Sequence, residues 1–556
     1  MRRLTLAVGS AAGALALTTT ASPVLAAPSP QTPQARFAAQ RIDWKPCIED
    51  PGAPPVIKRL DCGTMTVPLD WNAPNGATQL KIAVSRLRAG GGKARGAVFT
   101  NPGGPGGPGL TLPLALAGPD GNARLSQAMD IIGIDVRGTG QSTNVTCALT
   151  DPLEPLNVRD RGKRNTAKLL GQARTIAQAC QRNSGTLGRH ITTWQTVRDL
   201  DLLRALLGQK KIHWVGYSGG SWLGAHYATA FPKNTGRFVL DSNTEFTAPW
   251  QKVFANQPMA FERRFRKDFT PWAAKYGSRY KLGKTGEQVR RTYEAMRADL
   301  AREPLPLLEG GYFYAGDLDN LIAGALYAKA NFPELARIMS VLRRYTGVKA
   351  RSAAGTRDLS RSIRALRDRW TPLRPAGEGD APDADIATFY GITCNDTPRT
   401  GTPADLAKRT AASGRKYPLV GYARIIDPCQ YWKRPNVKLP VPTGKGVPPT
   451  LMVQSAHDPA TPYEGAVAAH RRFAGSRLLS VTREGDHAIY AGGNACVDKV
   501  VDAFVIDGVL PGKDLSCKGM PLPVPPKDVQ SQSAATAPQH PLLRADALAD
   551  RYRLKV

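Results

Sequence analysis

The chain has 556 residues, and its 75 Lys and Arg against 45 Asp and Glu give a formal net charge of +30. With 42% apolar and 22% charged residues it has the composition of a globular protein, which excludes an intrinsically disordered chain. After residue 26 no run reaches the roughly 18 consecutive apolar residues of a membrane-spanning helix, so we expect a soluble mature protein without a membrane span.

The N-terminus has the pattern of a secretory signal. A basic start at Met1-Arg2-Arg3 precedes a mostly apolar run from Leu4 to Leu17, and Val24-Leu25-Ala26 supplies the small residues of a cleavage site. We therefore expect residues 1–26 to be removed on export and the protein to be extracellular. Residues 27–39 are rich in Pro, Gln and Ala, which indicates a short pro-segment or linker.

Alternating strands and helices are predicted between residues 97 and 240. Short apolar runs typical of buried strands are Ala97 to Thr100, Asp130 to Val136, Lys211 to Val215 and Arg237 to Leu240. Residues 196–207 have the apolar spacing of an amphipathic helix, with Gly208 just past its end. This alternation predicts an α/β fold with a mostly parallel sheet.

One of these strands leads into a nucleophile motif. The strand 211–215 is followed by Gly216-Tyr217-Ser218-Gly219-Gly220, and Ser221 to Phe231 is predicted as a helix ended by Pro232. In the α/β-hydrolase fold a turn of this kind exposes the hydroxyl of a strained serine. The G-x-S-x-G pattern alone also occurs by chance, so the strand and helix around Ser218 are what favour this serine as the nucleophile.

The first predicted strand also ends in glycines. It runs into the segment from Asn101 to Gly107, where backbone without side chains can point its N–H groups at a substrate oxygen. In a hydrolase of this fold, such a loop supplies half of the oxyanion hole, and the N–H of Gly219 supplies the other half. A plain turn is the alternative for this segment.

An acid and a histidine are expected downstream, in that order. The strand predicted at 449–454 ends just before Asp458, and the strand predicted at 477–481 leads to His487. Because the carboxyl ends of parallel strands share one edge of a sheet, we predict Asp458 as the acid and His487 as the base. His457 is the rival base, although adjacent side chains at a strand end point apart. Asp241 is the alternative acid.

Other chemistries find no support. The sequence has no H-E-x-x-H motif and no C-x-x-C pair, so we expect neither a metal site nor a cofactor. Residues 337–374 hold eleven basic and two acidic residues without interleaved aromatics. Arginines recur there at helical spacing, which favours a solvated helix face over a nucleic-acid groove. Weak adhesion to anionic cell-wall polymers remains a secondary expectation.

Four motifs in this order resemble those of a known family. They are Pro102-Gly103-Gly104-Pro105-Gly106-Gly107, Asp135-Val136-Arg137-Gly138-Thr139-Gly140-Gln141-Ser142, the elbow around Ser218, and Asp458-Pro459-Ala460-Thr461-Pro462. Over about residues 40–520 the chain is similar to the secreted tripeptidyl aminopeptidases of actinobacteria. These serine peptidases belong to the α/β-hydrolase proline-iminopeptidase family.

The resemblance implies an activity and a set of roles. It implies a removable pro-segment, an inserted cap domain and hydrolysis of peptides from a free N-terminus. By position in the motifs, Ser218 becomes the nucleophile, Asp458 the acid and His487 the base, and Gly104 and Gly219 become the oxyanion donors. Two departures concern substrate selection. Members often have Tyr where this chain has Gly219, and can carry an acid where it has Thr393.

The cysteines fit an exported protein. Eight of them allow 105 pairings, which the sequence alone does not distinguish. The resemblance favours four bridges between neighbours, at spacings of 15, 33, 35 and 21 residues. The cysteines are Cys47, Cys62, Cys147, Cys180, Cys394, Cys429, Cys496 and Cys517.

The spacing of the predicted triad divides the chain. Ser218 and Asp458 lie 240 residues apart, more than the intervening strand–helix units need, so residues 246–440 are predicted as a largely helical cap. Residues 40–245 and 441–520 would form the core. We expect 521–556 to be a flexible tail with a short helix from Leu542 to Leu554.

The predicted function is that of a secreted serine exopeptidase. Recognition of a free N-terminus needs a carboxylate for the substrate ammonium, and Glu262 and Asp396 are the candidates in the cap. A carboxylesterase or lipase with the same fold and triad is the alternative enzyme, since fold does not fix substrate. A non-catalytic cell-wall adhesin is the alternative that is not an enzyme.

Overall fold

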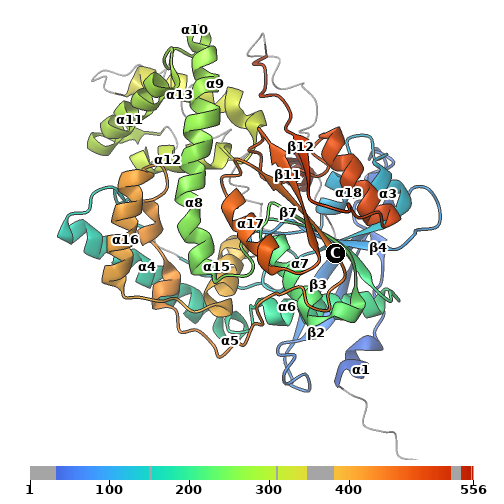
Figure 1. Ribbon diagram of the computed structural model, residues 1–556. Helices are drawn as coiled ribbons and strands as arrows, with labels where there is room; N and C mark the ends of the chain where they lie inside the picture. Colours follow the sequence, from blue (N-terminus) through green and yellow to red (C-terminus); the bar gives the residue numbers. More distant parts are fainter. Residues whose placement is uncertain are drawn as a thin grey trace, which may run out of the picture.

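A computed structural model describes residues 33–149, 153–307, 311–346, 381–526, 540–551, 554 and 556 (Figure 1). The predicted signal segment 1–26 lies outside the described residues, as do residues 347–374 of the basic stretch and residues 527–539 of the tail. Among the described helices, none combines the length and apolar character needed to cross a membrane.

One ten-stranded sheet forms the core, in the order β1-β2-β3-β5-β4-β6-β7-β10-β11-β12. Every neighbouring pair from β5 to β12 is parallel, whereas β1, β2 and β3 form an antiparallel edge that joins β5. The strands are β1 Lys45–Pro46, β2 Leu60–Pro68, β3 Gln79–Leu87, β4 Ala97–Asn101, β5 Asp130–Ile134, β6 Ile212–Tyr217, β7 Thr235–Asp241, β10 Thr450–Ser455, β11 Ser476–Thr482 and β12 Leu515–Lys518. The predicted α/β-hydrolase fold is confirmed.

Helices cover both faces of the sheet (Figure 1). Alternate side chains of each central strand enter opposite cores; in β7, Leu240 joins one core and Val239 the other. One face is covered by α6 (Thr193–Leu206), α7 (Gly219–Ala230) and α17 (Tyr463–Arg472). The other is covered by α2 (Leu112–Leu116), α3 (Arg124–Ala128), α18 (Ala495–Asp507) and α19 (Pro541–Arg551).

The chain between β7 and β10 is mainly helical. Its first group packs around buried aromatic residues such as Phe265, Phe269 and Phe332. This group comprises α8 Trp250–Arg264, the π-helical turn η3 Phe265–Phe269, α9 Thr270–Lys275, α10 Gly277–Tyr280, α11 Gly286–Arg302, the hairpin β8 Leu305–Pro306 and β9 Tyr312–Phe313, α12 Ala315–Ala325, η4 Lys329–Asn331 and α13 Phe332–Tyr345. We use the name cap for the helices between β7 and β10.

A second group of helices combines two parts of the sequence. From the cap come α15 Ala384–Asp396, α16 Pro403–Lys416, η5 Ala423–Ile425 and η6 Pro428–Tyr431. They pack with α4 (Lys163–Asn183) and α5 (Gly185–Gly188), which precede α6 in the part of the chain assigned above to the core. The guanidinium of Arg174 lies 4.9 Å from the ring centroid of Tyr431, and Asp383 accepts a hydrogen bond from Thr146 at 2.6 Å.

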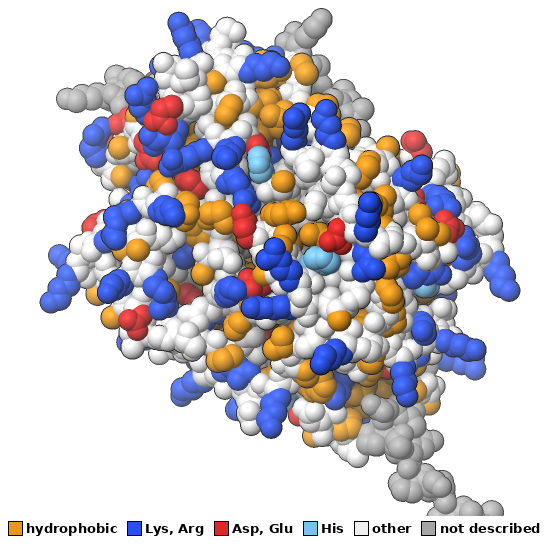
Figure 2. All heavy atoms as spheres, viewed as in Figure 1, with side chains coloured by type: hydrophobic (Ala, Val, Ile, Leu, Met, Phe, Trp, Pro, Cys, Tyr) orange, Lys and Arg blue, Asp and Glu red, His pale blue; other side chains and the backbone are white. Residues whose placement is uncertain are grey.

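The four disulfides join successive cysteines, as the resemblance implies. They are Cys47–Cys62, Cys147–Cys180, Cys394–Cys429 and Cys496–Cys517. Lys and Arg side chains are spread over the face drawn in Figure 2, with acidic and apolar side chains between them. That face therefore has no single basic groove of the kind that tracks a nucleic-acid backbone.

The two ends of the described chain differ from the expected linker and flexible tail. A helix, α1 (Pro33–Ala38), lies in the expected pro-segment, and Phe37 packs edge-on against Trp71 at 5.8 Å between ring centroids. At the other end α19 packs on α2, where Arg544 donates to the carbonyl of Ala115 at 2.6 Å. The predicted terminal helix therefore forms, and it belongs to the core layer.

Candidate active site

Ser218 lies between β6 and α7 in a strained turn. Its φ of 54° is one that residues other than glycine rarely adopt. Close approach of the backbone requires the glycines that follow, because a Cβ on Gly219 would lie 2.9 Å from the nitrogen of Pro105. A Cβ on Gly220 would lie 2.6 Å from the carbonyl oxygen of Asn101. The turn leaves Ser218 half-buried at the N-terminus of a helix, where negative charge is stabilised.

The glycine-rich loop after β4 lies against this turn. A Cβ on Gly103 would be 2.7 Å from the nitrogen of Gly219, so the loop and the elbow are in backbone contact. The N–H of Gly103 donates to Oδ1 of Asn101 at 3.0 Å. Within the described residues, the N–H groups of Gly104 and Gly219 donate to no protein acceptor. Two free donors on touching turns fit the requirements of an oxyanion hole.

His487 and Asp458 form a buried pair beyond the ends of β11 and β10. Nδ1 of His487 lies 3.0 Å from each carboxylate oxygen of Asp458, and the side chains are 2% and 0% exposed. Asp458 also accepts the N–H groups of Ala460 and Thr461, each at 2.9 Å. These bonds fix the carboxylate, which favours the tautomer with the proton on Nδ1 and leaves Nε2 able to accept a proton.

The end of β7 joins the elbow to the histidine loop. The carbonyl of Asp241 accepts the N–H of Ser218 at 3.0 Å, and its carboxylate accepts the N–H of Tyr490 at 2.8 Å. Burial raises the pKa of Asp241 to about 6. Within the described structure this carboxylate makes no hydrogen bond to the His487 ring, so the alternative acid has a positioning role. The Ser218 hydroxyl itself has no hydrogen bond among the described residues, which is common in unliganded hydrolases.

The rival base, His457, pairs with a different carboxylate. Its Nδ1 lies 2.9 Å from Oδ1 of Asp268 in η3, and Asp268 also pairs with Arg264 at 2.8 Å. Burial raises the pKa of Asp268, but the hydrogen bond from His457 and the charge of Arg264 outweigh burial and hold that pKa below its ordinary value. His457 is thus oriented by the cap, away from Asp458.

The two candidates for binding the substrate ammonium have internal partners. One carboxylate oxygen of Glu262 pairs with Arg266 at 2.5 Å and the other accepts the N–H of Leu419 at 3.2 Å. Asp396 accepts both the N–H and the hydroxyl of Thr193, at 2.8 and 2.6 Å. Burial raises the pKa of Asp396 to about 6. Both carboxylates are thus hydrogen-bonded within the protein in this conformation. Among the described residues, neither carboxylate forms a hydrogen bond or ion pair with Ser218 or its flanking glycines.

Sequence reasoning missed the cap side chain that packs on the base. The ring of Tyr327 packs edge-on against the His487 ring, with centroids 5.2 Å apart. The main-chain carbonyl of Tyr327 accepts the main-chain N–H of His487 at 2.8 Å. Tyr327 follows α12 and carries no motif, so no sequence signal indicated it. In the described part of the chain, no three His, Cys, Asp or Glu side chains gather in a way that could hold a metal ion.

Comparison with known proteins agrees with this geometry. A family model described as "alpha/beta hydrolase fold" matches residues 97–337, and one described as "TAP-like protein" matches residues 417–517. The first match contains the elbow, and the second contains Asp458 and His487. The chain is therefore an α/β hydrolase with the serine nucleophile motif of that class.

Curated relatives place it more narrowly. It is 34% identical to the tripeptidyl aminopeptidase of Streptomyces lividans, over 88% of this chain and 89% of the relative. It is 25% identical to the serine protease Hip1 of Mycobacterium tuberculosis, over 86% and 91%, and 29% identical to a carboxylesterase B of the same species, over 88% and 92%. The chain belongs to the tripeptidyl aminopeptidase family of α/β hydrolases.

Proposed function

We propose that the protein is a secreted serine exopeptidase that releases short fragments, most simply tripeptides, from the free N-terminus of peptides. The observation that carries the proposal is the buried His487–Asp458 pair at the same sheet edge as the strained Ser218. The name of the Streptomyces relative, similar over nearly the whole of both chains, supports the substrate class. The signal pattern and the four disulfides support export.

Acylation would begin at Ser218. As its oxygen attacks the scissile carbonyl carbon, Nε2 of His487 takes the hydroxyl proton, and Asp458 stabilises the imidazolium that forms. The N–H groups of Gly104 and Gly219 would stabilise the oxyanion. The imidazolium then gives its proton to the leaving amine, the C–N bond breaks, and the N-terminal fragment remains as an ester on Ser218.

Deacylation would use the same groups with water as the nucleophile. His487 takes a proton from water while the water oxygen attacks the ester carbonyl, and the oxyanion again forms at the two glycine N–H groups. The ester C–O bond breaks and His487 returns the proton to the Ser218 oxygen. The products are a peptide acid and the free enzyme, without any cofactor.

The relative named carboxylesterase B supports a second candidate, an esterase on the same triad. The peptidase is favoured over the esterase because the relative named tripeptidyl aminopeptidase is 34% identical and the one named carboxylesterase B is 29% identical. Amide and ester substrates with matched acyl groups separate the two functions directly.

The test compares three chromogenic substrates with purified protein and with Ser218→Ala. They are a free-amine tripeptide anilide, its N-acetylated twin and a short aryl ester. We expect cleavage of the free-amine anilide at least about tenfold faster than that of its blocked twin, because a lost charge-assisted contact costs about 1.5–3 kcal/mol. Ser218→Ala should be inactive with an unchanged unfolding midpoint. Cleavage of the ester without cleavage of the anilide would contradict the peptidase and support the esterase.

We also propose that its strongly basic composition, a net charge of +30 over the full chain, gives the secreted protein a weak affinity for anionic cell-wall polymers. The physical reason is long-range attraction between a strongly basic surface and polyanions, which salt screens. Retention on purified cell walls at 20 mM salt and release at 500 mM, identical for Ser218→Ala, would support this property. Retention that does not change with salt would contradict it.

A further inference from the structure

A cavity in the cap combines aromatic walls with an excess of positive charge. It has a volume of about 310 Å³ and lies between α8, α15, α16 and the segment 424–429. We call it the arginine pocket, and the residues that matter here are Phe254, Phe389, Arg399, Arg409, Arg424 and Asp427. Three guanidinium groups face one carboxylate, so the pocket is built for an anionic guest and disfavours an ammonium group.

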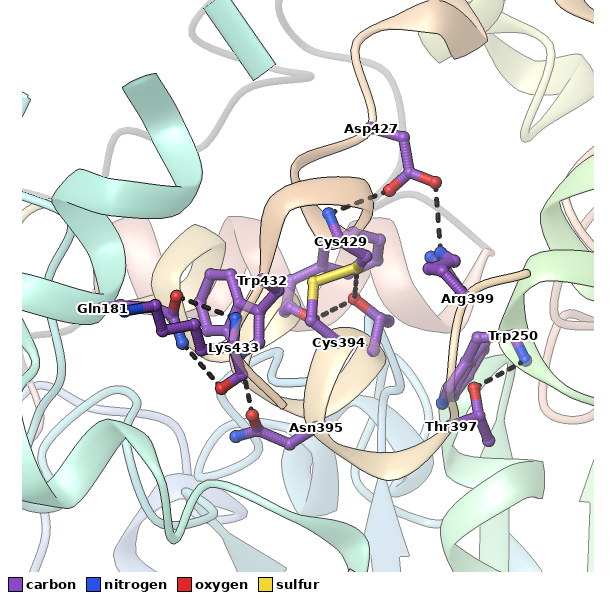
Figure 3. The surroundings of a disulfide bond; sticks show 12 residues. Gln181, Trp250, Cys394, Asn395, Thr397, Arg399, Asp427, Cys429, Trp432 and Lys433 are labelled. Atoms are coloured by element: carbon purple, nitrogen blue, oxygen red, sulfur yellow. Dashed lines mark hydrogen bonds and ion pairs between the residues drawn. A yellow bond between two sulfur atoms is a disulfide. The ribbon is translucent and has the colours of Figure 1, made fainter. Parts of the chain in front are cut away.

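Among the described residues, the guanidinium of Arg399 has a hydrogen-bond partner for one of its N–H groups but not for another. Its Nε donates to Asp427 at 3.1 Å, beside the Cys394–Cys429 bridge (Figure 3). The side chain is 6% exposed, and within the described structure its buried Nη1 has no hydrogen-bond partner. A buried donor without a partner is unfavourable, and a ligand oxygen that accepts from it would remove that penalty. The other carboxylate oxygen of Asp427 accepts the N–H of Cys429 at 3.1 Å, so Asp427 is satisfied internally.

Arg424 supplies a second cation to the pocket lining. Its guanidinium lies 5.5 Å from the ring centroid of Phe254 and donates to the side-chain oxygen of Gln257. Among the described residues no carboxylate lies within ion-pair distance of it. Burial lowers the pKa of Arg424 despite the attraction of Tyr327 and Asp427, yet an arginine stays charged at neutral pH.

Residues next to those that line the pocket contact the catalytic loops on two sides. On one side Gln257, the partner of Arg424, donates to the carbonyl of Ala460 at 2.7 Å, two residues after Asp458. On the other side the residue before Phe389 touches the oxyanion loop, because a Cβ on Gly106 would lie 2.7 Å from Cγ2 of Thr388. A peptide residue spans at most about 3.6 Å, so a tripeptide bound at Ser218 extends about 11 Å from the scissile bond.

The geometry points to a further specificity site: the arginine pocket binds the carboxylate of an Asp or Glu side chain in the N-terminal fragment of the substrate. This inference rests on the proposed peptidase function and adds a side-chain preference to it. The carboxylate accepts hydrogen bonds from Arg399 and Arg424, and its methylene groups lie against Phe254 and Phe389. Such charge-assisted bonds give both affinity and direction.

The experiment measures kcat/KM for free-amine tripeptide anilides that carry Glu, Gln or Lys at each position in turn on an alanine background. At one position we expect Glu to exceed Gln by about 10- to 100-fold and Lys to be the poorest. Arg399→Gln and Arg424→Gln should each reduce the Glu-to-Gln ratio to within about twofold of unity, and a general loss of activity cancels in this ratio because both substrates meet the same variant. Arg424→Lys should retain part of the ratio. Arg415→Gln, on the exposed face of α16, is the matched control and should retain all of it.

Two results would overturn the inference while the peptidase function stands: equal rates for Glu and Gln at all three positions, or a Glu preference that survives both Gln variants. If even the all-alanine anilide is inert, the proposed peptidase function fails instead. The pocket is then tested by calorimetric titration of the Ser218→Ala protein with Glu- and Gln-containing tripeptides. Equal affinity for the two would refute the anion site.

Discussion

The parallel sheet and the cap place their side chains by different means. In the sheet, Ser218, Asp458 and His487 each stand just beyond the end of a strand, so a short local segment decides where each one lies. In the cap, side chains are positioned by partners that are distant in the sequence, as Gln257 is by Ala460, 203 residues away. The proposed catalytic residues are thus placed by local sequence, and the side chains of the cap by tertiary contacts. Changes in the two regions should therefore affect different observables.

The two regions meet in a buried ionic joint beside the base. Arg264 of α8 is 1% exposed and pairs with Asp486 at 2.5 Å, the residue before His487. The main-chain N–H of Lys329 donates to the same carboxylate at 2.7 Å. The joint links the cap to the loop that carries His487, the proposed base, so a variant there should affect both regions.

The largest effect is expected in the core, from Asp458→Asn. The amide keeps the shape of the carboxylate but presents an N–H to Nδ1 of His487, which favours the wrong tautomer. We expect kcat to fall about 10⁴-fold with a small change in KM. Steady-state kinetics on the tripeptide anilide checks this. A loss below about tenfold would mean that another group orients His487, and Asp241→Asn would then be the next variant to measure.

A smaller effect is expected at the joint, from Arg264→Met. Removing the cation leaves Asp268 and Asp486 without their buried partner, which should cost about 3–5 kcal/mol of unfolding free energy. The matched control is Arg263→Met, whose partner Glu464 is half exposed and whose loss should cost under about 1 kcal/mol. Urea unfolding of the three proteins measures both values. Equal stability of the two variants would show that the joint contributes nothing.

The smallest effect concerns pH and sharpens the account of the core. His226 is buried in α7 with Nδ1 2.8 Å from the carbonyl of Trp222, and burial lowers its pKa from 6.5 to about 4. Between pH 6.5 and pH 4 the His226 side chain is protonated in the unfolded chain but neutral in the folded protein. The free energy of unfolding therefore falls as the pH drops. At pH 5 this amounts to about 2 kcal/mol relative to pH 7.

We therefore expect His226→Gln to be less destabilising at pH 5 than at pH 7 by that amount. Burial raises the pKa of Asp241, Asp396 and Asp498 to about 6, and these groups act with the opposite sign, since the folded protein takes up their protons first. Taking the difference between variant and wild type at each pH removes this opposing contribution. A difference that does not change between pH 7 and pH 5 would contradict a buried neutral His226.

Local sequence was enough to predict much of the core. The glycines around Ser218 follow from close backbone contacts, and the apolar runs before Asp458 and His487 follow from strands buried on both faces. The antiparallel edge was not predicted. Its strands β2 and β3 contain polar residues among the apolar ones, which blurs the pattern.

The sequence was enough to predict that the cap is an insertion, but not which of its side chains contact each other or the site. Glu262 pairs with Arg266 and Asp396 with Thr193, and no pattern in the sequence indicates such pairs. Their binding of the substrate ammonium stays a prediction. Tyr327 and Arg424 were missed for the same reason. Their contacts are with residues more than a hundred positions away, His487 for Tyr327 and Gln257 for Arg424, and a single sequence carries no signal for such contacts.

The mixed origin of the second helical group sets a rule for protein engineering. A chimera that exchanges the cap as one cassette between β7 and β10 would separate Asp383 from Thr146 and Tyr431 from Arg174. It would also leave the carbonyl of Tyr422 without Arg161, which donates to it at 2.7 Å. Grafting a new substrate preference onto this scaffold therefore requires two coordinated crossovers, one that carries residues 145–183 and one that carries the cap.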